Sequence, residues 1–178
     1  QMAASNRRKG SVAAISFDVR KAFDTVPFDK LIECLKTEYE VPDCQLSWLR
    51  SYFSNRKQAV RVDGSLSTWR EVKAGVVQGS VIGPLLFIAY FDKVTAELEN
   101  GAVTIKYADD LLLVHPLNSP ENEVSLQQCI NSITTAIEAK SMSFNPAKCC
   151  LLLATESTVP YHPLAQPAIG MTPIGQTS

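Results

Sequence analysis

The chain has 178 residues, 46% of them hydrophobic, which is enough for one ordinary domain with a core of its own. Its 17 lysine and arginine residues nearly balance 18 aspartate and glutamate residues. This balance argues against a nucleic-acid-binding protein that is basic throughout, although a local patch or a neighbouring domain could supply positive charge. The longest apolar runs, such as residues 85–91, are too short to cross a bilayer. The first ten residues lack the apolar core of a signal peptide, and a start at Gln rather than Met hints at a piece of something longer.

The cysteines carry information about compartment rather than function. They are odd in number, with no Cys-x-x-Cys pair and no histidine at zinc spacing. We therefore expect reduced core thiols in an intracellular protein of the cytoplasm, the nucleus or both. The five are Cys34, Cys44, Cys129, Cys149 and Cys150.

Hydrophobic periodicity predicts alternating strands and helices along the chain. In chain order these are a buried strand over residues 12–17, helices over 28–39 and 45–53, a hairpin turning at Asp63-Gly64, a glycine-punctuated loop over 75–84, a helix over 85–98, strands over 104–107 and 111–114, a helix over 123–140, and a strand over 148–154. Without the insertions this order is strand, helix, strand, strand, helix, strand. It predicts an α+β fold of the ferredoxin-like type, an antiparallel sheet with helices packed on one face.

The chain divides by composition into three parts. Residues 1–10 form a polar lead-in, residues 11–155 carry the predicted domain, and residues 156–178 are rich in Pro, Ser and Thr with almost no charge. We expect this tail to be mobile or loosely packed.

Two adjacent aspartates interrupt the apolar stretch "KYADDLLLV". Because unpaired buried charge is very costly, Asp109 and Asp110 are expected at the solvated tip of a hairpin. Asp18 ends the first strand, which neighbours that hairpin in a ferredoxin-like sheet. Clustered carboxylates repel unless a cation lies among them, and Mg²⁺ binds through a few carboxylates together with phosphates. Two such ions roughly 4 Å apart would suit phosphoryl transfer, although an Asp-Asp pair also occurs in turns for conformational reasons alone.

Four stretches follow one another in a distinctive order: "FDVRKAFDTV", "GVVQGSVIGPLLF", "YADD" and "NPAKC". In this order they resemble the four motifs of the reverse transcriptase palm, especially that of non-LTR (LINE-type) retrotransposons. "YADD" alone is weak, but the four together are specific. The resemblance implies a palm domain over residues 11–155, with the fingers and thumb supplied by other parts of a longer polyprotein.

The resemblance also implies a metal site. Asp18 and Asp109 would hold two Mg²⁺ ions, for which Mn²⁺ can substitute, and Asp110 would contribute more loosely. The main-chain carbonyl of Val19 would be a further ligand. Lys148 would protonate or neutralise departing pyrophosphate as a general acid.

Further residues are implied to contact the nucleotide and the template. Phe23 would lie beneath the sugar of the incoming nucleotide, leaving no room for a 2′-hydroxyl. Gln78 and Gly79 would line the nascent base pair, with Gly79 allowing a close backbone approach. The backbone of Arg20, Lys21, Ala22 and Phe23 would face the triphosphate. Tyr107 completes this nucleotide- and template-binding set.

Simpler interpretations stay open for several of these residues. Phe23 could be an apolar residue at a helix start, Gly79 loop punctuation, and Lys148 a solvated lysine at a strand edge. Asp24 is interpreted as a helix cap, and His115 as a satisfied core or surface histidine.

The activity that the resemblance implies is RNA-directed DNA polymerisation on an RNA template from a DNA primer and deoxynucleoside triphosphates, with no membrane partner. Group II intron and retron reverse transcriptases are alternatives within the same class of enzyme. An inactive retrotransposon remnant, or a domesticated domain that only binds partners, is the alternative outside it.

Overall fold

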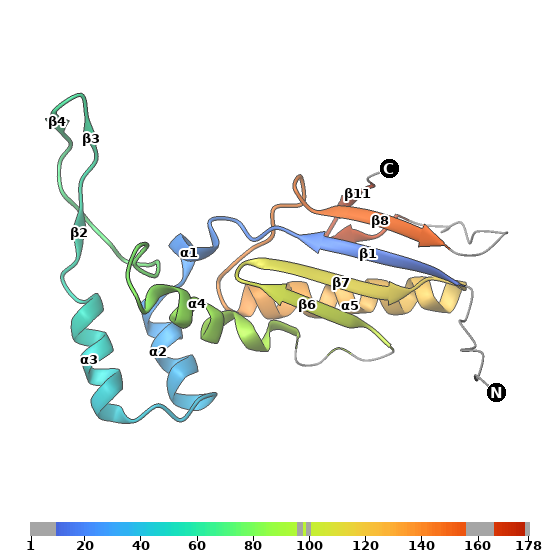
Figure 1. The fold of residues 1–178 in the computed structure, drawn as a ribbon, viewed down its shortest axis with the longest axis horizontal. Helices are drawn as coiled ribbons and strands as arrows, with labels where there is room; N and C mark the ends of the chain where they lie inside the picture. Colours follow the sequence, from blue (N-terminus) through green and yellow to red (C-terminus); the bar gives the residue numbers. More distant parts are fainter. Residues whose placement is uncertain (1–9, 96–97, 99–100, 156–165, 177–178) are drawn as a thin grey trace, which may run out of the picture. The chain divides into compact units, whose positions relative to one another are not determined.

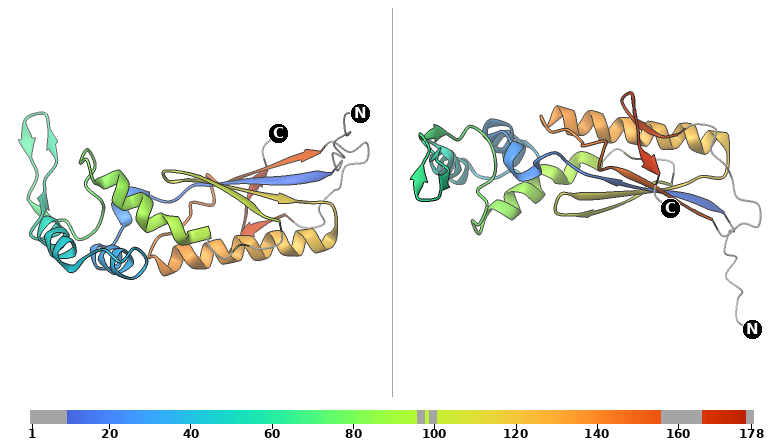
Figure 2. Two further views of the ribbon diagram at one scale, coloured as in Figure 1. Left: turned by 60° about the horizontal axis from the view of Figure 1, so that its bottom comes forward. Right: turned by 90° about the horizontal axis from the view of Figure 1, so that it is seen from above.

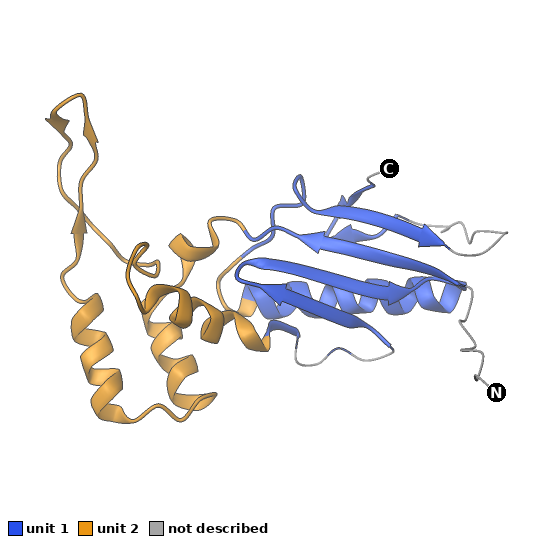
Figure 3. Ribbon diagram, in the orientation of Figure 1, with its two compact units in different colours: residues 1–19, 94–138, 143–178 blue, residues 20–93, 139–142 orange. Residues whose placement is uncertain are grey.

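The computed structural model describes residues 10–95, 98, 101–155 and 166–176 (Figure 1). The chain forms two compact units (Figure 3). The first comprises residues 1–19, 94–138 and 143–178, and the second comprises residues 20–93 and 139–142. No helix within the described ranges has the length and apolarity needed to span a membrane.

The first unit is built on a five-stranded sheet with the order β11-β8-β1-β7-β6. The four long strands pair antiparallel, and β11 joins β8 in parallel. Without β11 the strands of this sheet are, in chain order, β1, β6, β7 and β8, and the first of them, β1, lies between the fourth, β8, and the third, β7. This is the ferredoxin-like order that the sequence predicts. The strands are β1 (Ser11–Phe17), β6 (Val103–Tyr107), β7 (Asp110–Pro116), β8 (Cys150–Thr155) and β11 (Gly175–Gln176).

Helix α5 (Pro120–Ala139) runs along one face of this sheet (Figure 2). Alternate residues of β1 and β7 are buried, as expected where one face of a strand packs against a core. His115 is fully buried and its ring nitrogens lie 3.0 Å from Ser125 Oγ and 2.6 Å from the carbonyl oxygen of Pro116, so it is a satisfied core histidine. The other buried side chains here are Ala13, Ile15, Phe17, Leu111, Leu113, Leu126, Ile130, Ile133 and Ile137.

The second unit combines short helices with an extended two-stranded ribbon. Its helices are α1 (Ala22–Thr25), α2 (Phe28–Thr37), α3 (Asp43–Phe53) and α4 (Gly83–Phe91). The ribbon consists of β2 (Lys57–Gln58), β3 (Arg61–Val62), β4 (Ser65–Leu66) and β5 (Arg70–Glu71). It turns at Asp63 and Gly64, with φ angles of 47° and 83°, which confirms the predicted hairpin. Leu31 and Leu46, both fully buried, belong to the core of this unit.

The predicted helix over residues 85–98 is wrong at both ends. Helix α4 begins at Gly83, with Pro84 in its first turn, where a missing N–H costs nothing. It ends at Phe91, and the backbone then tightens into a 3₁₀ turn, η1 (Asp92–Thr95), as is common at helix ends. Residues 96–97 lie outside the described part of the chain.

Residues 166–176 of the tail form short strands, and the expectation of a mobile or loosely packed tail stays a prediction. These strands are β9 (Ala168–Ile169), β10 (Thr172–Pro173) and β11. The side-chain amide of Gln127 donates to the carbonyl of Ala168 at 2.9 Å and accepts from its N–H at 3.0 Å. Burial of Ile169 and Ile174 adds an apolar anchor. Residues 156–165 and 177–178 lie outside the described residues.

All five cysteines are free thiols, but they do not share one environment. Cys34, Cys129 and Cys149 are buried, as predicted. The prediction of a core thiol is wrong for Cys44, which is exposed on α3, and Cys150 is half-buried.

Candidate nucleotidyl-transfer site

The three aspartates of the first unit lie at one end of its sheet. Strands β1 and β7 pair with Phe17 opposite Leu111. The pairing of the two strands ends there, so Asp18, which follows β1, and Asp110, which begins β7, belong to the same end of this strand pair. Within β7, Asp110 shares a strand face with Leu112, opposite the buried face of Leu111 and Leu113.

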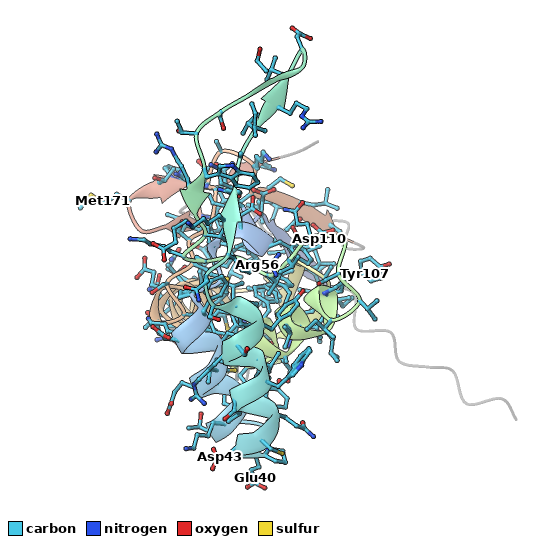
Figure 4. The ribbon with its side chains drawn as sticks, turned by 90° about the vertical axis from the view of Figure 1, so that its left-hand side faces the viewer. Glu40, Asp43, Arg56, Tyr107, Asp110 and Met171 are labelled. Atoms are coloured by element: carbon cyan, nitrogen blue, oxygen red, sulfur yellow. The ribbon has the colours of Figure 1, made fainter. Side chains whose placement is uncertain are left out.

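The tight turn between β6 and β7 sets the position of the other aspartate. Tyr107 pairs with Asp110, which leaves Ala108 and Asp109 as the two turn residues. Ala108 has a φ of 53°, a conformation that an L-residue with a Cβ rarely adopts. Asp109 is thereby held half-buried at the tip, while Asp110 and Tyr107 are exposed (Figure 4). The turn thus places both aspartates at the end of the strand pair that Asp18 follows, and the assignment of Asp18 and Asp109 as the main ligands stays a prediction.

Lys148 lies beside Asp18. Its Nζ is 3.7 Å from Asp18 Oδ1, with 67% of the lysine side chain and 37% of the aspartate side chain exposed. The backbone holds the two segments together, because Asn145 N donates to the carbonyl of Asp18 at 2.8 Å. An ion pair this exposed contributes little to stability. Its position next to the aspartates is therefore of more interest for chemistry than for folding.

The buried thiol of Cys149 contacts the backbone at Asp18. Asp18 N donates to Cys149 Sγ at 3.4 Å, and Val19 forms a bridge with Phe144. Burial raises the pKa of the Cys149 thiol, with the nearby Asp18 charge acting in the same direction. The thiol thus stays neutral near pH 7 and adds no charge to the aspartates.

The oxygen donors at this end of the sheet suit a hard divalent cation. Asp18, Asp109 and Asp110 supply carboxylates at one end of the strand pair, and Mg²⁺ is commonly held by one or two carboxylates together with substrate phosphates. Within the described ranges, no three His, Cys, Asp or Glu side chains are gathered closely enough to hold a metal ion. The donor set fits an ion that is completed by a phosphate-bearing substrate.

The second unit holds the rest of the predicted site residues. Lys21 begins α1 in the left-handed conformation, with φ and ψ of 45°. Half-buried Phe23 stacks on Phe87, with ring centroids 4.4 Å apart and planes 20° from parallel. The Phe23 carbonyl accepts from Val76 N, and the Val26 carbonyl accepts from Gly75 N, both at 2.8 Å. These bonds fasten the start of the 75–82 loop to the segment that follows Asp18 in sequence.

Gly75 and Gly79 have different structural reasons to be glycine. Gly75 has a φ of 99°, and a Cβ there would lie 3.0 Å from backbone atoms of Asp24, so the contact itself excludes a side chain. Gly79 has a φ of 77° and no described atom within 4 Å of the corresponding position. Its glycine is required by the backbone angle, and the space beside it is open to a ligand.

Asp24 is not the helix cap that the sequence suggests. It lies inside α1, and the helix that follows has no side-chain cap. Instead its Oδ1 accepts a 2.7 Å hydrogen bond from Gln78 Nε2. This contact orients one of the predicted template-contacting side chains. Sequence reasoning missed it because no local pattern links residues 54 positions apart.

A polar pocket of about 650 Å³ opens between these segments and the ribbon. Four cations, Lys21, Arg56, Lys57 and Lys73, outnumber the two acids that line it, Asp24 and Glu71. Its size and charge suit a phosphate-bearing ligand. Arg56, Lys57 and Lys73 escaped the sequence analysis, although the local excess of lysine and arginine after residue 55 is a signal that could have found them.

The structure therefore distributes the predicted site residues over two places. Asp18, Val19, Tyr107, Asp109, Asp110 and Lys148 belong to the first unit, and Arg20, Lys21, Ala22, Phe23, Gln78 and Gly79 belong to the second.

Comparison with known families gives a single answer. Residues 2–168 match the family described as reverse transcriptase (RNA-dependent DNA polymerase). The chain is 33% identical over 160 residues to the probable RNA-directed DNA polymerase from transposon BS of Drosophila melanogaster, covering 82% of this chain and 17% of the relative. It is 30% identical over 158 residues to the retrovirus-related Pol polyprotein from type-1 retrotransposable element R2 of Nasonia vitripennis, covering 84% and 15%. The chain thus spans a small part of the length of these curated relatives.

Solved structures support the fold. The telomerase of Candida tropicalis, in complex with a fragment of telomeric RNA, superposes with a TM-score of 0.66 at 12% identity. The match covers 86% of this chain and 27% of that one. The apo form of the telomerase, truncated from its C-terminal domain, gives a TM-score of 0.62. The predicted α+β polymerase palm and the resemblance to non-LTR retrotransposon enzymes are both confirmed.

Proposed function

The chain belongs to the reverse transcriptase (RNA-dependent DNA polymerase) family, and we propose that it is the palm of an RNA-directed DNA polymerase from a non-LTR retrotransposon. In the proposed reaction, the 3′-oxygen of a primer forms a bond to the α-phosphorus of a deoxynucleoside triphosphate. The bond from that phosphorus to the β-phosphate oxygen breaks, the 3′-hydroxyl loses its proton, and pyrophosphate leaves. Such chemistry depends on positioning and on neutralising charge.

The observation that carries this proposal is that Asp18 follows β1 at the end where β1 pairs with β7, the end at which Asp109 and Asp110 form the turn into β7, with Lys148 Nζ 3.7 Å from Asp18 Oδ1. Asp18 and Asp109, with a looser contribution from Asp110 and with the Val19 carbonyl, would hold two Mg²⁺ ions. Bound there, the ions would lower the charge on the reacting phosphate and favour the primer alkoxide. Lys148 would neutralise the departing pyrophosphate or give it a proton.

The second unit would bind the nucleotide and the templating strand. The cations of the 650 Å³ pocket suit the triphosphate, which the backbone from Arg20 to Phe23 would also face. Stacking on Phe87 fixes the ring of Phe23. A fixed ring is needed if Phe23 is to reject a 2′-hydroxyl by its bulk. The open space beside Gly79 suits close approach of a base pair.

The partners that follow are an RNA template, a DNA primer and deoxynucleoside triphosphates, together with the fingers and thumb of a longer polyprotein. The small share of the relatives that this chain spans agrees with that context. We place the protein inside the cell, in the cytoplasm or nucleus, because its buried cysteines are free thiols.

Primer extension tests the activity directly. The chain would be incubated with a DNA primer on an RNA template and the four deoxynucleotides, with Mg²⁺ and separately with Mn²⁺. We expect extension by the parent chain and a loss of about 100-fold or more in Asp110→Asn, since a fixed charge at the reacting phosphate is worth that much. Asp43→Asn, which removes an exposed aspartate of α3, is the matched control.

Equal extension by the parent chain and Asp110→Asn would count against the proposal, because it would remove this aspartate from the chemistry. No extension by any variant with either ion would show that the palm alone does not suffice, and the assay would then be repeated with the fingers and thumb of the longer polyprotein present.

A further inference from the structure

One edge of the five-stranded sheet in the first unit is open to pairing. Strand β6 is the last strand in the sheet order, at the edge opposite to β11 (Figure 1). Its sequence, VTIKY, is made mostly of β-branched and aromatic residues that favour strands, and no proline or glycine interrupts it. Among the strands that the structure describes, β7 alone pairs with β6. The outer side of β6 therefore presents a row of backbone N–H and C=O groups to which a further strand could pair.

The side chains of β6 add an apolar surface to this edge. Val103 and Ile105 are each 56% exposed, and Tyr107 is 82% exposed. Pairing with β7 sets Val103 beside Val114 and Ile105 beside Leu112, both half-buried, on the sheet face that α5 does not cover. Natural proteins usually block such an edge with several charges, a proline or a bulge. Here the exposed residues of the edge strand are all apolar or aromatic.

The sequence of β6 is complementary to itself when two copies run antiparallel. In the register that centres on Ile105, all five residues pair, and Ile105 lies opposite Ile105 of the second copy. Val103 lies opposite Tyr107, so each apolar side chain of the exposed face meets another apolar side chain. Lys106 lies opposite Thr104, so the lysines of the two copies do not face each other. Moving the centre to Lys106 would oppose the two lysines, and moving it to Thr104 would leave Tyr107 beyond the end of the other strand.

We propose that the β6 edge binds a second copy of this chain and forms a two-fold dimer whose sheet continues across both copies. The self-complementary register favours a second copy over an unrelated strand, because every residue of β6 is paired without opposed charges. An interface that uses the same patch on both copies closes at two, so no fibre follows. The other edge of the sheet does not offer the same surface, because β11 has only two residues and pairs in parallel with β8.

The dimer should be weak, because the contact is small. Five residues on each side compare with about 20–30 in a stable interface. We therefore expect a dissociation constant of about 10–100 µM for the 178-residue chain, measured by sedimentation equilibrium over about 5–500 µM. Ile105→Lys would oppose two lysines at the centre of the dimer and should weaken it about tenfold or more. Val124→Lys, at a residue of α5 that is 60% exposed, is the control and should leave the dissociation constant unchanged.

A cross-link tests the register. Ile105→Cys would bring two thiols directly opposite each other, with Cα atoms about 5 Å apart and within reach of a disulfide. Val103→Cys is its matched control, because Val103 is equally exposed on the same strand but would lie roughly 13 Å along the strand from its copy. Both variants also carry Cys44→Ser and Cys150→Ser, since these two thiols are not buried. Under mild oxidation, Ile105→Cys should form disulfide dimers about tenfold faster than Val103→Cys.

Three results would overturn the proposal. A monomer up to about 500 µM would leave the edge to a strand of another protein. Equal dimerisation of the parent chain and Ile105→Lys would place the contact on another surface, and so would equal cross-linking rates of the two cysteine variants. Circular dichroism of each variant establishes that the fold is retained. Because neither measurement uses nucleotides, primer or metal ions, both results are independent of whether the chain extends a primer.

Discussion

The aspartates of the first unit and the cations of the second are held in place in different ways. Asp18 directly follows Phe17, which is 0% exposed, and Asp110 directly precedes Leu111, which is 1% exposed. Both aspartates are therefore attached to the buried core of the sheet. The ribbon cations Arg61 and Arg70 instead belong to a hairpin that is exposed along its length.

The difference follows from the range of the interactions involved. Ligands of a metal ion must be fixed within a fraction of an ångström, which favours rigid elements supported by a packed core. Attraction between a cation and a polyanion acts over a Debye length, about 10 Å at 0.1 M salt, and tolerates motion. We therefore expect substitutions in the sheet to affect stability and chemistry, and substitutions in the ribbon to affect binding alone.

The largest expected effect on stability is in the core beneath the aspartates. Ile15 is 0% exposed, so Ile15→Ala should lower the free energy of unfolding by about 2–5 kcal/mol. Val62 in the ribbon is 61% exposed, and Val62→Ala should change it by less than about 0.5 kcal/mol. Urea unfolding followed by circular dichroism measures both. Similar losses of unfolding free energy in Ile15→Ala and Val62→Ala would contradict the difference between the packed sheet and the exposed ribbon.

Lys148 should affect chemistry without affecting stability. Lys148→Met should slow primer extension about 100-fold, because it removes the proposed general acid. It should change the free energy of unfolding by less than about 0.5 kcal/mol, because the pair with Asp18 is exposed. Lys148→Arg keeps the charge and should keep part of the rate, and Lys93→Met is the control. An unaltered rate in Lys148→Met would remove this residue from the mechanism.

Alkaline pH should destabilise the second unit. Burial raises the pKa of Cys34 from 9.0 to about 11, despite the opposing Lys140 charge, and burial also raises the pKa of Tyr39 from 10.0 to about 12. Above pH 9 the unfolded Cys34 thiol loses its proton while the folded one keeps it. The stability linked to this thiol is therefore complete below pH 9 and is lost as pH rises through 11. Urea midpoints from pH 7 to 11 should fall less steeply in Cys34→Ala, and identical slopes would contradict this account.

The smallest expected effect is a gain in stability at the aspartate turn. Ala108 adopts a φ of 53°, which costs an L-residue about 1–2 kcal/mol. Glycine pays no such cost but has more backbone entropy to lose, so Ala108→Gly should stabilise the fold by up to about 1 kcal/mol. Ala102→Gly, at a residue without positive φ, should instead destabilise it slightly. Thermal unfolding of both variants decides the sign.

Much of the sheet was predictable because its strands bury one face. The signals in β1 and β7 are short, nearly continuous apolar runs, VAAISF and LLLV, and the two aspartates interrupt the second run where only a turn avoids their burial. The sequence also placed the hairpin at Asp63-Gly64 through its turn residues. These signals are local, and each reflects the backbone geometry of a few neighbouring residues.

The features that could not be predicted from the sequence depend on contacts between residues far apart in the chain. The hydrogen bond from Gln78 to Asp24 joins residues 54 positions apart. Strand β11 is only two residues long and becomes a strand by pairing with β8, which no composition rule anticipates. The placement of Asp109 in the turn and of Asp110 in β7 likewise follows from strand register and the conformation of Ala108. Residue types indicated the chemistry, and tertiary contacts decided which atoms meet.

The central claim is that Asp18, Asp109 and Asp110 hold a divalent cation together with the phosphates of the substrate. Titration of Mn²⁺ into the parent chain with a deoxynucleoside triphosphate present and no primer, followed by electron paramagnetic resonance, measures this without catalysis. We expect Asp18→Asn and Asp110→Asn each to weaken Mn²⁺ binding about tenfold or more, with Asp43→Asn unchanged. Equal Mn²⁺ affinity in all four proteins would contradict the account.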